Sequence, residues 1–488
     1  MITHSRLTVP SRKELILAVP AAVASGALIA TDPVHVTPTV LVCVIGVVLI
    51  APLVYRLATR TFDPFEPIVW FVLAWGAMFV ARPAAMIHNQ DIIYQDSWRV
   101  IDLTPTFGDS LTLGLVGAVS FIVAYGSPLG YLFARKCREA PVDATWDMLI
   151  PGAVITGAVG LVLGVIWLHT AGKSPLSLFV GRAARTSREL LQIQNGSSYL
   201  LHGPYLLIPA AIVLLTAGWS RRDFVVTSLG AGFATVAILR ALALGDRFML
   251  LPMVGGLFIF WYLRRGRRPS LLGFVATIVV FLYVATVIGQ TRTADYRAQH
   301  STLQAAEQTL TDPSQVLATI THSTDSSEVP ILAGAMLYVP KDVPFQYGNA
   351  TVGDLVTRPI PRAMWPGKPL PPAQQVFEHM MPEAFAAGSS NKAGSSLLVF
   401  YMDAGLVGVI LGMALYGILA RTVYEYYNRW SDRIFAQLVL ALFTTLMANM
   451  VRDGFADTVE RAVLILGPVW LIYRLAGRTR AGRVAVTS

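Results

Sequence analysis

The sequence is poor in charge, in cysteine and in the short motifs that mark nucleotide or metal chemistry. Only 14% of its 488 residues are charged, whereas a soluble domain usually carries roughly 25%. Its two cysteines, Cys43 and Cys137, lie far apart in the chain, and we expect no disulfide between them. The eight histidines are dispersed, and the sequence holds no P-loop, no GxGxxG ahead of a helix and no HExxH. We therefore expect no metal and no cofactor.

Long apolar stretches replace the missing charge. Hydrophobic residues make up 54% of the chain, and they recur in runs as long as a bilayer span. This pattern predicts an all-α, polytopic membrane helix bundle with about 12 transmembrane helices. The predicted spans cover residues 15–30, 38–55, 66–81, 110–134, 149–169, 199–219, 223–243, 247–263, 270–290, 396–420, 434–451 and 462–476.

The basic residues predict the orientation of the bundle. More than half of the 38 lysines and arginines fall in the two termini and in the short connections on one side. By the positive-inside rule, both termini are predicted to be cytoplasmic and the protein to lie in the cytoplasmic (inner) membrane. The same bias accounts for much of the net charge of +9, so nucleic acid is not an expected partner. We interpret the basic N-terminal segment as leading into a retained first span, because no signal-peptide cleavage pattern follows it.

One long connection divides the sequence. Residues 1–290 are expected to hold the first nine helices, 291–395 a large extracytoplasmic loop, and 396–488 the last three helices and a cytoplasmic tail, all in one integrated membrane domain. Within the loop, Asp295–Leu310 and Pro372–Phe385 are predicted to be short amphipathic helices. Pro330–Val339 is apolar but too short to span, so we expect it to dip into the membrane interface.

Arginines on the predicted outer side are candidates for an anion site. Arg182, Arg185 and Arg188 recur at a three-residue spacing, which on a helix forms a cationic stripe. Guanidinium groups match phosphate oxygens bidentately, so the stripe predicts a clamp for a pyrophosphate or another anionic head group. The alternative is an interfacial helix whose arginines rest on lipid phosphates.

A second polar group lies at the tight turn within LRALALGDRFMLLP. Arg240, Asp246 and Arg247 cluster there between two predicted spans, on the outer side. Two arginines and one aspartate at a hairpin tip form a candidate anion site facing the outer leaflet. Snorkelling arginines and an aspartate that caps the following helix are the structural alternative.

The segment RPIPRAMWPGKPLPP, from Arg358 to Pro372, is stiff and basic. Its prolines fix φ and exclude regular helix or sheet hydrogen bonding. Arg358, Arg362 and Lys368 supply donors, and Trp365 is suited to stack on a sugar face or to anchor at the membrane interface. The alternative is a structural cap over the bundle.

Two further sets of residues are candidates for chemistry. MVRDGFADTVER, near the last predicted hairpin, brings opposite charges together, which is typical of a structural latch as much as of a binding site. Its charged residues are Arg452, Asp453, Asp457, Glu460 and Arg461. The acid–base candidates of the long loop are Asp354, Glu378, His379 and Glu383. Helical neighbours such as Glu378 and His379 point apart, so their spacing does not predict a dyad.

The order of these parts resembles the Wzy-type O-antigen polymerases, also called oligosaccharide repeat-unit polymerases. IPRAMWPGKP (Ile360–Pro369) is similar to the proline–arginine–tryptophan–lysine segment in the large external loop of that family. YMDAGLVGVILG (Tyr401–Gly412) resembles the glycine-punctuated span that follows the loop, and ALGDRFMLL (Ala243–Leu251) resembles the turn between middle spans. The likeness covers the span count and residues from about 180 to 420.

The resemblance implies a GT-C-like integral membrane glycosyltransferase. Its partners would be a lipid-linked oligosaccharide donor and acceptor and membrane lipid, with a chain-length regulator as a further candidate. A polyprenyl pyrophosphate would leave at the outer face, where cations stabilise its developing charge. We rank Arg247 first as a catalytic residue, followed by Arg185 and Arg188 on phosphate, and take His379 or Glu378 as the base. The predicted substrate-binding residues are Arg182, Arg185, Arg188, Arg240, Asp246, Arg358, Arg362, Trp365, Lys368 and Arg452.

Two other functions remain open from the sequence. An O-antigen ligase shares this layout and transfers the glycan to a different acceptor. A 12-helix transporter or lipid-linked glycan flippase has a similar span count, but its site lies near mid-membrane between repeated halves, and the sequence shows no such repeat.

Overall fold

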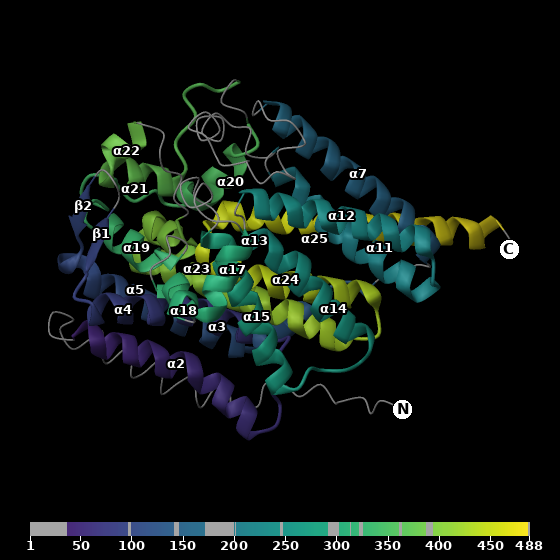
Figure 1. The fold of residues 1–488 in the computed structure, drawn as a ribbon, viewed down its shortest axis with the longest axis horizontal. Coiled ribbons are helices and arrows are strands. Elements are labelled where there is room, and N and C mark those ends of the chain that lie inside the picture. The colour runs from purple at the N-terminus through teal and green to yellow at the C-terminus, as the bar shows by residue number, and fades with distance from the viewer. Residues whose placement is uncertain are drawn as a thin grey trace.

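The computed structural model describes residues 37–95, 99–140, 146–170, 200, 202–244, 247–290, 302–312, 314–321, 326–360, 364–386 and 394–486. These residues form an almost entirely helical structure (Figure 1). The one described sheet is a short antiparallel hairpin of β1 (Ile93–Gln95) and β2 (Val100–Asp102), which the all-α prediction did not anticipate.

The helices of the N-terminal half overlap the predicted spans, but the predicted span 110–134 is divided between two of them. They are α2 (Pro38–Ala58), α3 (Pro67–Gly76), η2 (Ala77–Ala81), α4 (Arg82–His88), α5 (Thr104–Gly126), α6 (Pro128–Lys136), α7 (Trp146–Thr170), η3 (Gly203–Leu206), α11 (Leu207–Arg221) and α12 (Phe224–Leu244). Next come α13 (Arg247–Leu250), η4 (Leu251–Gly255), α14 (Gly256–Arg264) and α15 (Leu271–Gln290). The first predicted span, residues 15–30, lies outside the described residues.

The C-terminal half contains short helices followed by three long ones. The short helices are α17 (Thr302–Thr311), α18 (Ser314–Thr321), α19 (Glu328–Met336), η6 (Asn349–Gly353), α20 (Asp354–Thr357), α21 (Pro372–Met380) and α22 (Pro382–Ala386). The long ones are α23 (Ser396–Arg429), α24 (Ile434–Arg452) and α25 (Phe455–Val486). Pro372–Phe385, predicted as one helix, is divided into α21 and α22. The predicted helix Asp295–Leu310 overlaps α17, and its residues 295–301 lie outside the described residues.

Nine helices within the described residues are long and apolar enough to cross a membrane. Several of them leave large apolar side chains uncovered: Leu272 on α15 is 79% exposed and Val225 on α12 is 74% exposed. Extended apolar faces of this kind are unfavourable in water and suit a hydrocarbon environment. By contrast, α11 and α24 are almost wholly enclosed by protein and form the centre of the bundle.

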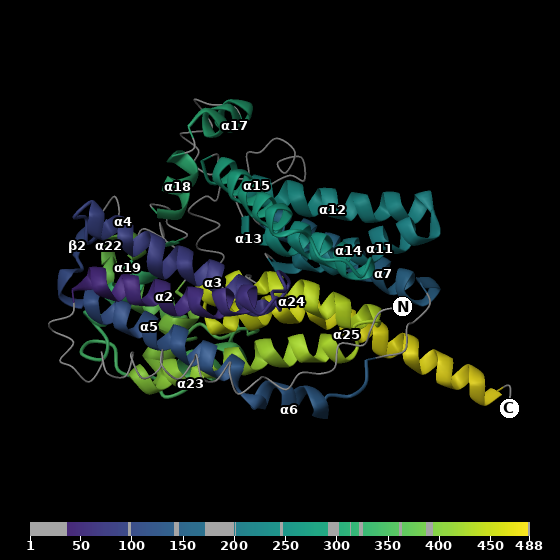
Figure 2. The same ribbon diagram turned by 90° about the horizontal axis from the view of Figure 1, so that it is seen from below.

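The basic turns gather at one end of the bundle, called here the basic end. Arg268 pairs with Asp63, and Arg221 pairs with Asp147. Nη1 of Arg429 donates to the carbonyl oxygen of Arg135 at 3.1 Å. The β1–β2 hairpin, α19 and α22 lie at the other end, called here the hairpin end (Figure 2).

The segment Pro330–Val339 is buried in protein. It forms most of α19, where the side chains of Leu332, Ala333 and Ala335 are fully buried, and α19 packs against α5 and α21. Our prediction that this segment dips into the membrane interface is therefore wrong. Hydrophobicity alone did not distinguish burial against other helices from burial in lipid.

A break in α23 was also not predicted. Ala404 and Gly405 have non-helical backbone angles, and Gly405 has φ of +58°, a conformation that glycine adopts at little cost. The Asp403 carboxylate accepts hydrogen bonds from the backbone N–H groups of Gly348 and Ala350 at 2.8 and 2.9 Å. Asp403, which directly precedes the break, therefore holds the loop ahead of η6 against α23.

Candidate functional site

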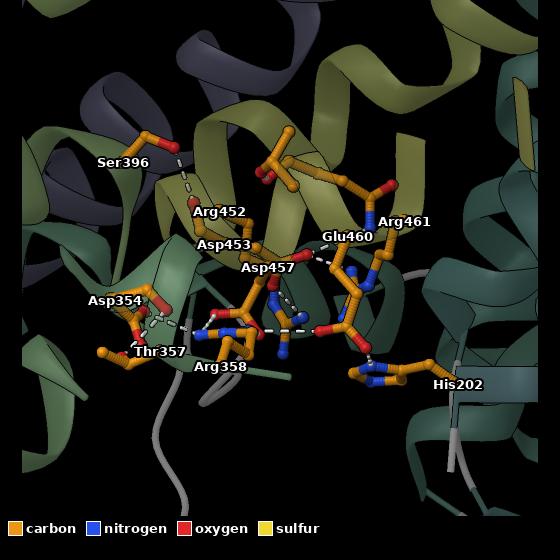
Figure 3. Close-up of polar contacts among 12 residues, drawn as sticks. His202, Asp354, Thr357, Arg358, Ser396, Arg452, Asp453, Asp457, Glu460 and Arg461 are labelled. Atoms are coloured by element: carbon orange, nitrogen blue, oxygen red, sulfur yellow. Dashed lines mark hydrogen bonds and ion pairs between the residues drawn. The ribbon is translucent and has the colours of Figure 1, made fainter. Parts of the chain in front are cut away.

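Arg358, the first residue of the proline-rich segment, contacts three carboxylates (Figure 3). Its Nη2 lies 2.9 Å from Oδ2 of Asp354 and 3.2 Å from Oδ2 of Asp457, and its Nη1 lies 3.4 Å from Oε2 of Glu460. Asp354 is four residues earlier, a helical spacing that brings side chains together. Asp457 and Glu460 share one face at the start of α25. The proline-rich segment therefore begins at a fixed point on the last long helix.

Burial and neighbouring charges shift the pKa values of Arg358 and Asp354. Burial opposes charge on Arg358, yet Asp457 and Asp354 together raise the pKa of its guanidinium above the ordinary value. Burial also raises the pKa of Asp354, and the neighbouring Arg358 only partly offsets that effect. Arg358 thus stays charged and holds the cluster together, whereas Asp354 is the carboxylate that gains least from being ionised.

Glu460 joins Arg358 to a histidine on another helix. Nδ1 of His202 lies 2.9 Å from Oε1 of Glu460, and the two side chains are 13% and 15% exposed. His202 directly precedes η3, and its ring lies edge-on to Tyr205 with the centroids 5.7 Å apart. The carboxylate and the aromatic ring together fix the orientation of the imidazole.

Asp453 organises the other half of the cluster, between α24 and α25. Its carboxylate contacts the guanidinium of Arg461 and lies 3.0 Å from Nη1 of Arg452 and 3.1 Å from Nδ2 of Asn449. Oγ of Ser396 donates to its carbonyl oxygen at 2.8 Å. These contacts join α23, α24 and α25. They form a structural latch, which was one of the two alternatives that the sequence left undecided.

The proline-rich segment closes onto itself after Arg358. Nζ of Lys368 donates to the carbonyl oxygens of Arg358 and Ile360 at 3.1 and 3.0 Å. Trp365 is 38% exposed. The lysine therefore shapes the loop through backbone oxygens.

A second buried charged network lies at the basic end. The side chain of Glu66, just ahead of α3, is fully buried and contacts the guanidinium of Arg56 from α2. The hydroxyl of Tyr125 donates to Oε1 of Glu66 at 2.6 Å, and Arg421 of α23 lies 3.7 Å from the same atom. Arg421 also pairs with Glu425 at 2.6 Å. Four helices are cross-linked there by compensated charges.

The other predicted site residues are divided between described and undescribed parts of the chain. Arg182, Arg185, Arg188, Asp246 and Arg362 lie outside the described residues. Arg247 begins α13, but its side chain is outside the described part. Arg240 is 3% exposed, and its Nη1 donates to Sδ of Met249 at 2.9 Å. The anion clamp that these residues form in our prediction stays a prediction.

The predicted bases, Glu378 and His379, lie on α21, away from the charged residues around Arg358 on α20 and α25. Glu378 and His379 are exposed on α21, and Nδ1 of His379 lies 2.8 Å from the carbonyl oxygen of Gln375. The helix α21 packs against α19, α22 and α23, whereas α20 packs against α25 (Figure 1). Glu383 is likewise exposed on α22.

Sequence reasoning missed His202. It lies 258 residues before Glu460 in the chain, so no local spacing links the two. The one sequence signal is a polar residue at the end of an apolar span. Within the described ranges, no group of three or more His, Cys, Asp or Glu residues is arranged to hold a metal ion.

Residues 177–467 match the model of a protein family described as a domain of unknown function (DUF8712). The match covers more than half of the 488 residues, and the chain belongs to this family. The matched range includes the proline-rich segment and the charged residues around Arg358, which are His202, Asp354, Arg452, Asp453, Asp457, Glu460 and Arg461. No curated protein matches the chain, and no solved structure matches it.

Proposed function

We propose that this member of the family is a membrane-embedded polysaccharide polymerase. It would join oligosaccharide repeat units carried on polyprenyl pyrophosphate at the outer face of the cytoplasmic membrane. The glycan would move from its lipid carrier to a sugar hydroxyl of another lipid-linked unit. In this proposal about 12 helices span the bilayer, both termini are cytoplasmic, and the hairpin end faces outward.

The anchoring of the proline-rich segment is the observation that carries this proposal. The segment that resembles the polymerases, Ile360–Pro369, lies within the proline-rich segment. That segment starts at Arg358, which three carboxylates fix against α20 and α25. A stiff loop held at its first residue places Trp365 and the following residues with little loss of chain entropy. Such a loop is suited to cover a sugar donor and to exclude the water that would hydrolyse it.

In this proposal a lipid diphosphate is the leaving group. Departure of a diphosphate from the anomeric carbon develops negative charge, which preorganised cations stabilise. Arg452 and Arg461 lie near Arg358 (Figure 3), but the carboxylate of Asp453 already compensates both of them. In our proposal the positive charge at the outer face therefore comes from Arg240, Arg247 and the arginines of residues 182–188.

The network at the basic end favours a transferase over a transporter. Alternating access would have to open the basic end, where Glu66 holds Arg56 and Arg421 in a buried network. Separating a buried ion from its partner costs about 3–5 kcal/mol. A glycan polymerase works at one face and has no need to open this end.

Deletion of the gene tests the proposal. Loss of the polymerase predicts surface glycans that contain a single repeat unit, restored to long chains by the wild-type gene on a plasmid. Full-length polymer that accumulates without attachment to its final acceptor would favour a ligase instead. Lipid-linked units trapped at the inner leaflet would favour a flippase, and an unchanged surface polysaccharide would remove all three functions.

A further inference from the structure

The His202–Glu460 pair has the geometry of a base held by a carboxylate. A carboxylate only accepts hydrogen bonds, so at 2.9 Å the Nδ1 atom of His202 carries the proton and donates it to Oε1 of Glu460. That tautomer places the lone pair on Nε2. In many hydrolytic and transfer enzymes this nitrogen is the atom of the histidine that accepts the proton. The ring faces Tyr205 edge-on, which limits its rotation.

The pair is also joined to the segment that we propose covers the donor. Glu460 contacts His202 through Oε1 and Arg358 through Oε2, so one carboxylate bridges the two. Arg358 begins the proline-rich segment, and Lys368 returns to the carbonyl oxygen of Arg358. Glu460 lies between the His202 ring and Arg358 and thereby links the imidazole to the first residue of this segment (Figure 3).

We infer that His202 is the general base of the glycosyl transfer and that Glu460 is its positioning residue, an inference that rests on the proposed polymerase function. The acceptor hydroxyl oxygen forms a bond with the anomeric carbon of the donor glycan. The bond from that carbon to the diphosphate oxygen breaks, and its electron pair leaves with the lipid diphosphate. Nε2 of His202 takes the hydroxyl proton and later releases it to water, so atoms and charge balance.

This assignment separates His202 from the bases that the sequence predicts. Glu378 and His379 are exposed on α21, and Nδ1 of His379 faces a carbonyl of its own helix. Among the described residues, no carboxylate contacts the His379 ring. His202, in contrast, has both an orienting carboxylate and a short chain of contacts to the proline-rich segment.

The test compares variants of the full-length protein in detergent or liposomes. The probe is lipid-linked oligosaccharide extracted from cells in which the gene is deleted, and the readout is polymer formed per minute at saturating and limiting probe. The variants are His202→Ala, Glu460→Gln and the double variant. The matched control is His88→Ala, an exposed histidine at the end of α4, and thermal unfolding checks that each variant is folded.

We expect His202→Ala to lower kcat by about 10²- to 10⁴-fold, the usual effect of removing a general base, with KM for the probe changed little. Glu460→Gln should lower kcat by a smaller factor. The double variant should lose no more than His202→Ala alone, because residues that act as one unit are not additive. His88→Ala should match the wild type.

Three results would overturn the inference, each in a distinguishable way. Wild-type protein that makes no polymer from the probe refutes the proposed function, and the base assignment with it. Wild-type protein that polymerises while folded His202→Ala keeps full kcat refutes the base assignment alone. Effects of the two single variants that simply add, with KM rising in both, would make the pair a structural contact.

Discussion

Arg358 is the residue whose removal most directly tests how the proline-rich segment is held. Replacing it with methionine keeps the aliphatic stem and leaves Asp354, Asp457 and Glu460 without their shared cation. Removing one partner of a buried ion pair costs about 3–5 kcal/mol. The Asp457 side chain is 37% exposed, so solvent screens part of the loss. We therefore expect Arg358→Met to lower the free energy of unfolding by about 3 kcal/mol.

The assay is denaturant unfolding of the purified protein in detergent, followed by tryptophan fluorescence. Arg358→Lys is the matched control: it keeps the charge but loses the forked geometry, so its cost should be smaller, about 1.5 kcal/mol. Asp457→Asn added to Arg358→Met should recover part of the loss. Hydrogen exchange of peptides covering 354–372 should accelerate in Arg358→Met. Unchanged unfolding and unchanged exchange in that variant would refute the idea that Arg358 anchors the segment.

Three further predictions concern other parts of the structure and use the same unfolding assay. Because burial holds the pKa of Asp354 above its ordinary value, its contribution to stability is present at low pH and is lost as pH rises through the raised pKa. We therefore expect Asp354→Asn to be neutral or stabilising at pH 7, with the difference from wild type gone once the pH falls below the ordinary aspartate pKa of 3.8; a loss as large as that of Arg358→Met would contradict this. Glu66→Gln should destabilise the basic end by about 3 kcal/mol, whereas Asp147→Asn, in an exposed pair with Arg221, should cost less than about 1 kcal/mol; equal costs would show that burial is not the cause. Asp403→Ala removes the acceptor for two backbone N–H groups and should cost about 2 kcal/mol, with Asp403→Asn milder; two equal losses would mean that the hydrogen bonds are not what matters there.

The arrangement also explains why one end of the bundle carries the functional proposal. At both ends, buried charges are compensated by neighbours from distant helices. At the basic end the network joins α2, α5, α23 and the start of α3. At the hairpin end the network includes His202 and the first residue of a proline-rich loop. Only the second combination brings a titratable ring together with a stiff, donor-rich segment.

Local features of the sequence were enough to locate the helices. Each predicted span from residue 38 onward coincides with helical structure, because apolar run length and turn residues are local properties of the chain. The sequence also indicated that polar residues collect in the turns and that Arg452, Asp453, Asp457, Glu460 and Arg461 form a latch or a site. The twelve-span count and the orientation stay predictions.

Which charges meet depends on how the helices pack in three dimensions. Arg358 reaches Asp457 across 99 residues and His202 reaches Glu460 across 258, and no periodicity in the sequence encodes such pairs. Packing likewise decided that α19 is buried by protein and that α23 breaks at Gly405. Hydropathy measures how much a segment avoids water, whereas the partner of a polar side chain depends on which helices lie beside it.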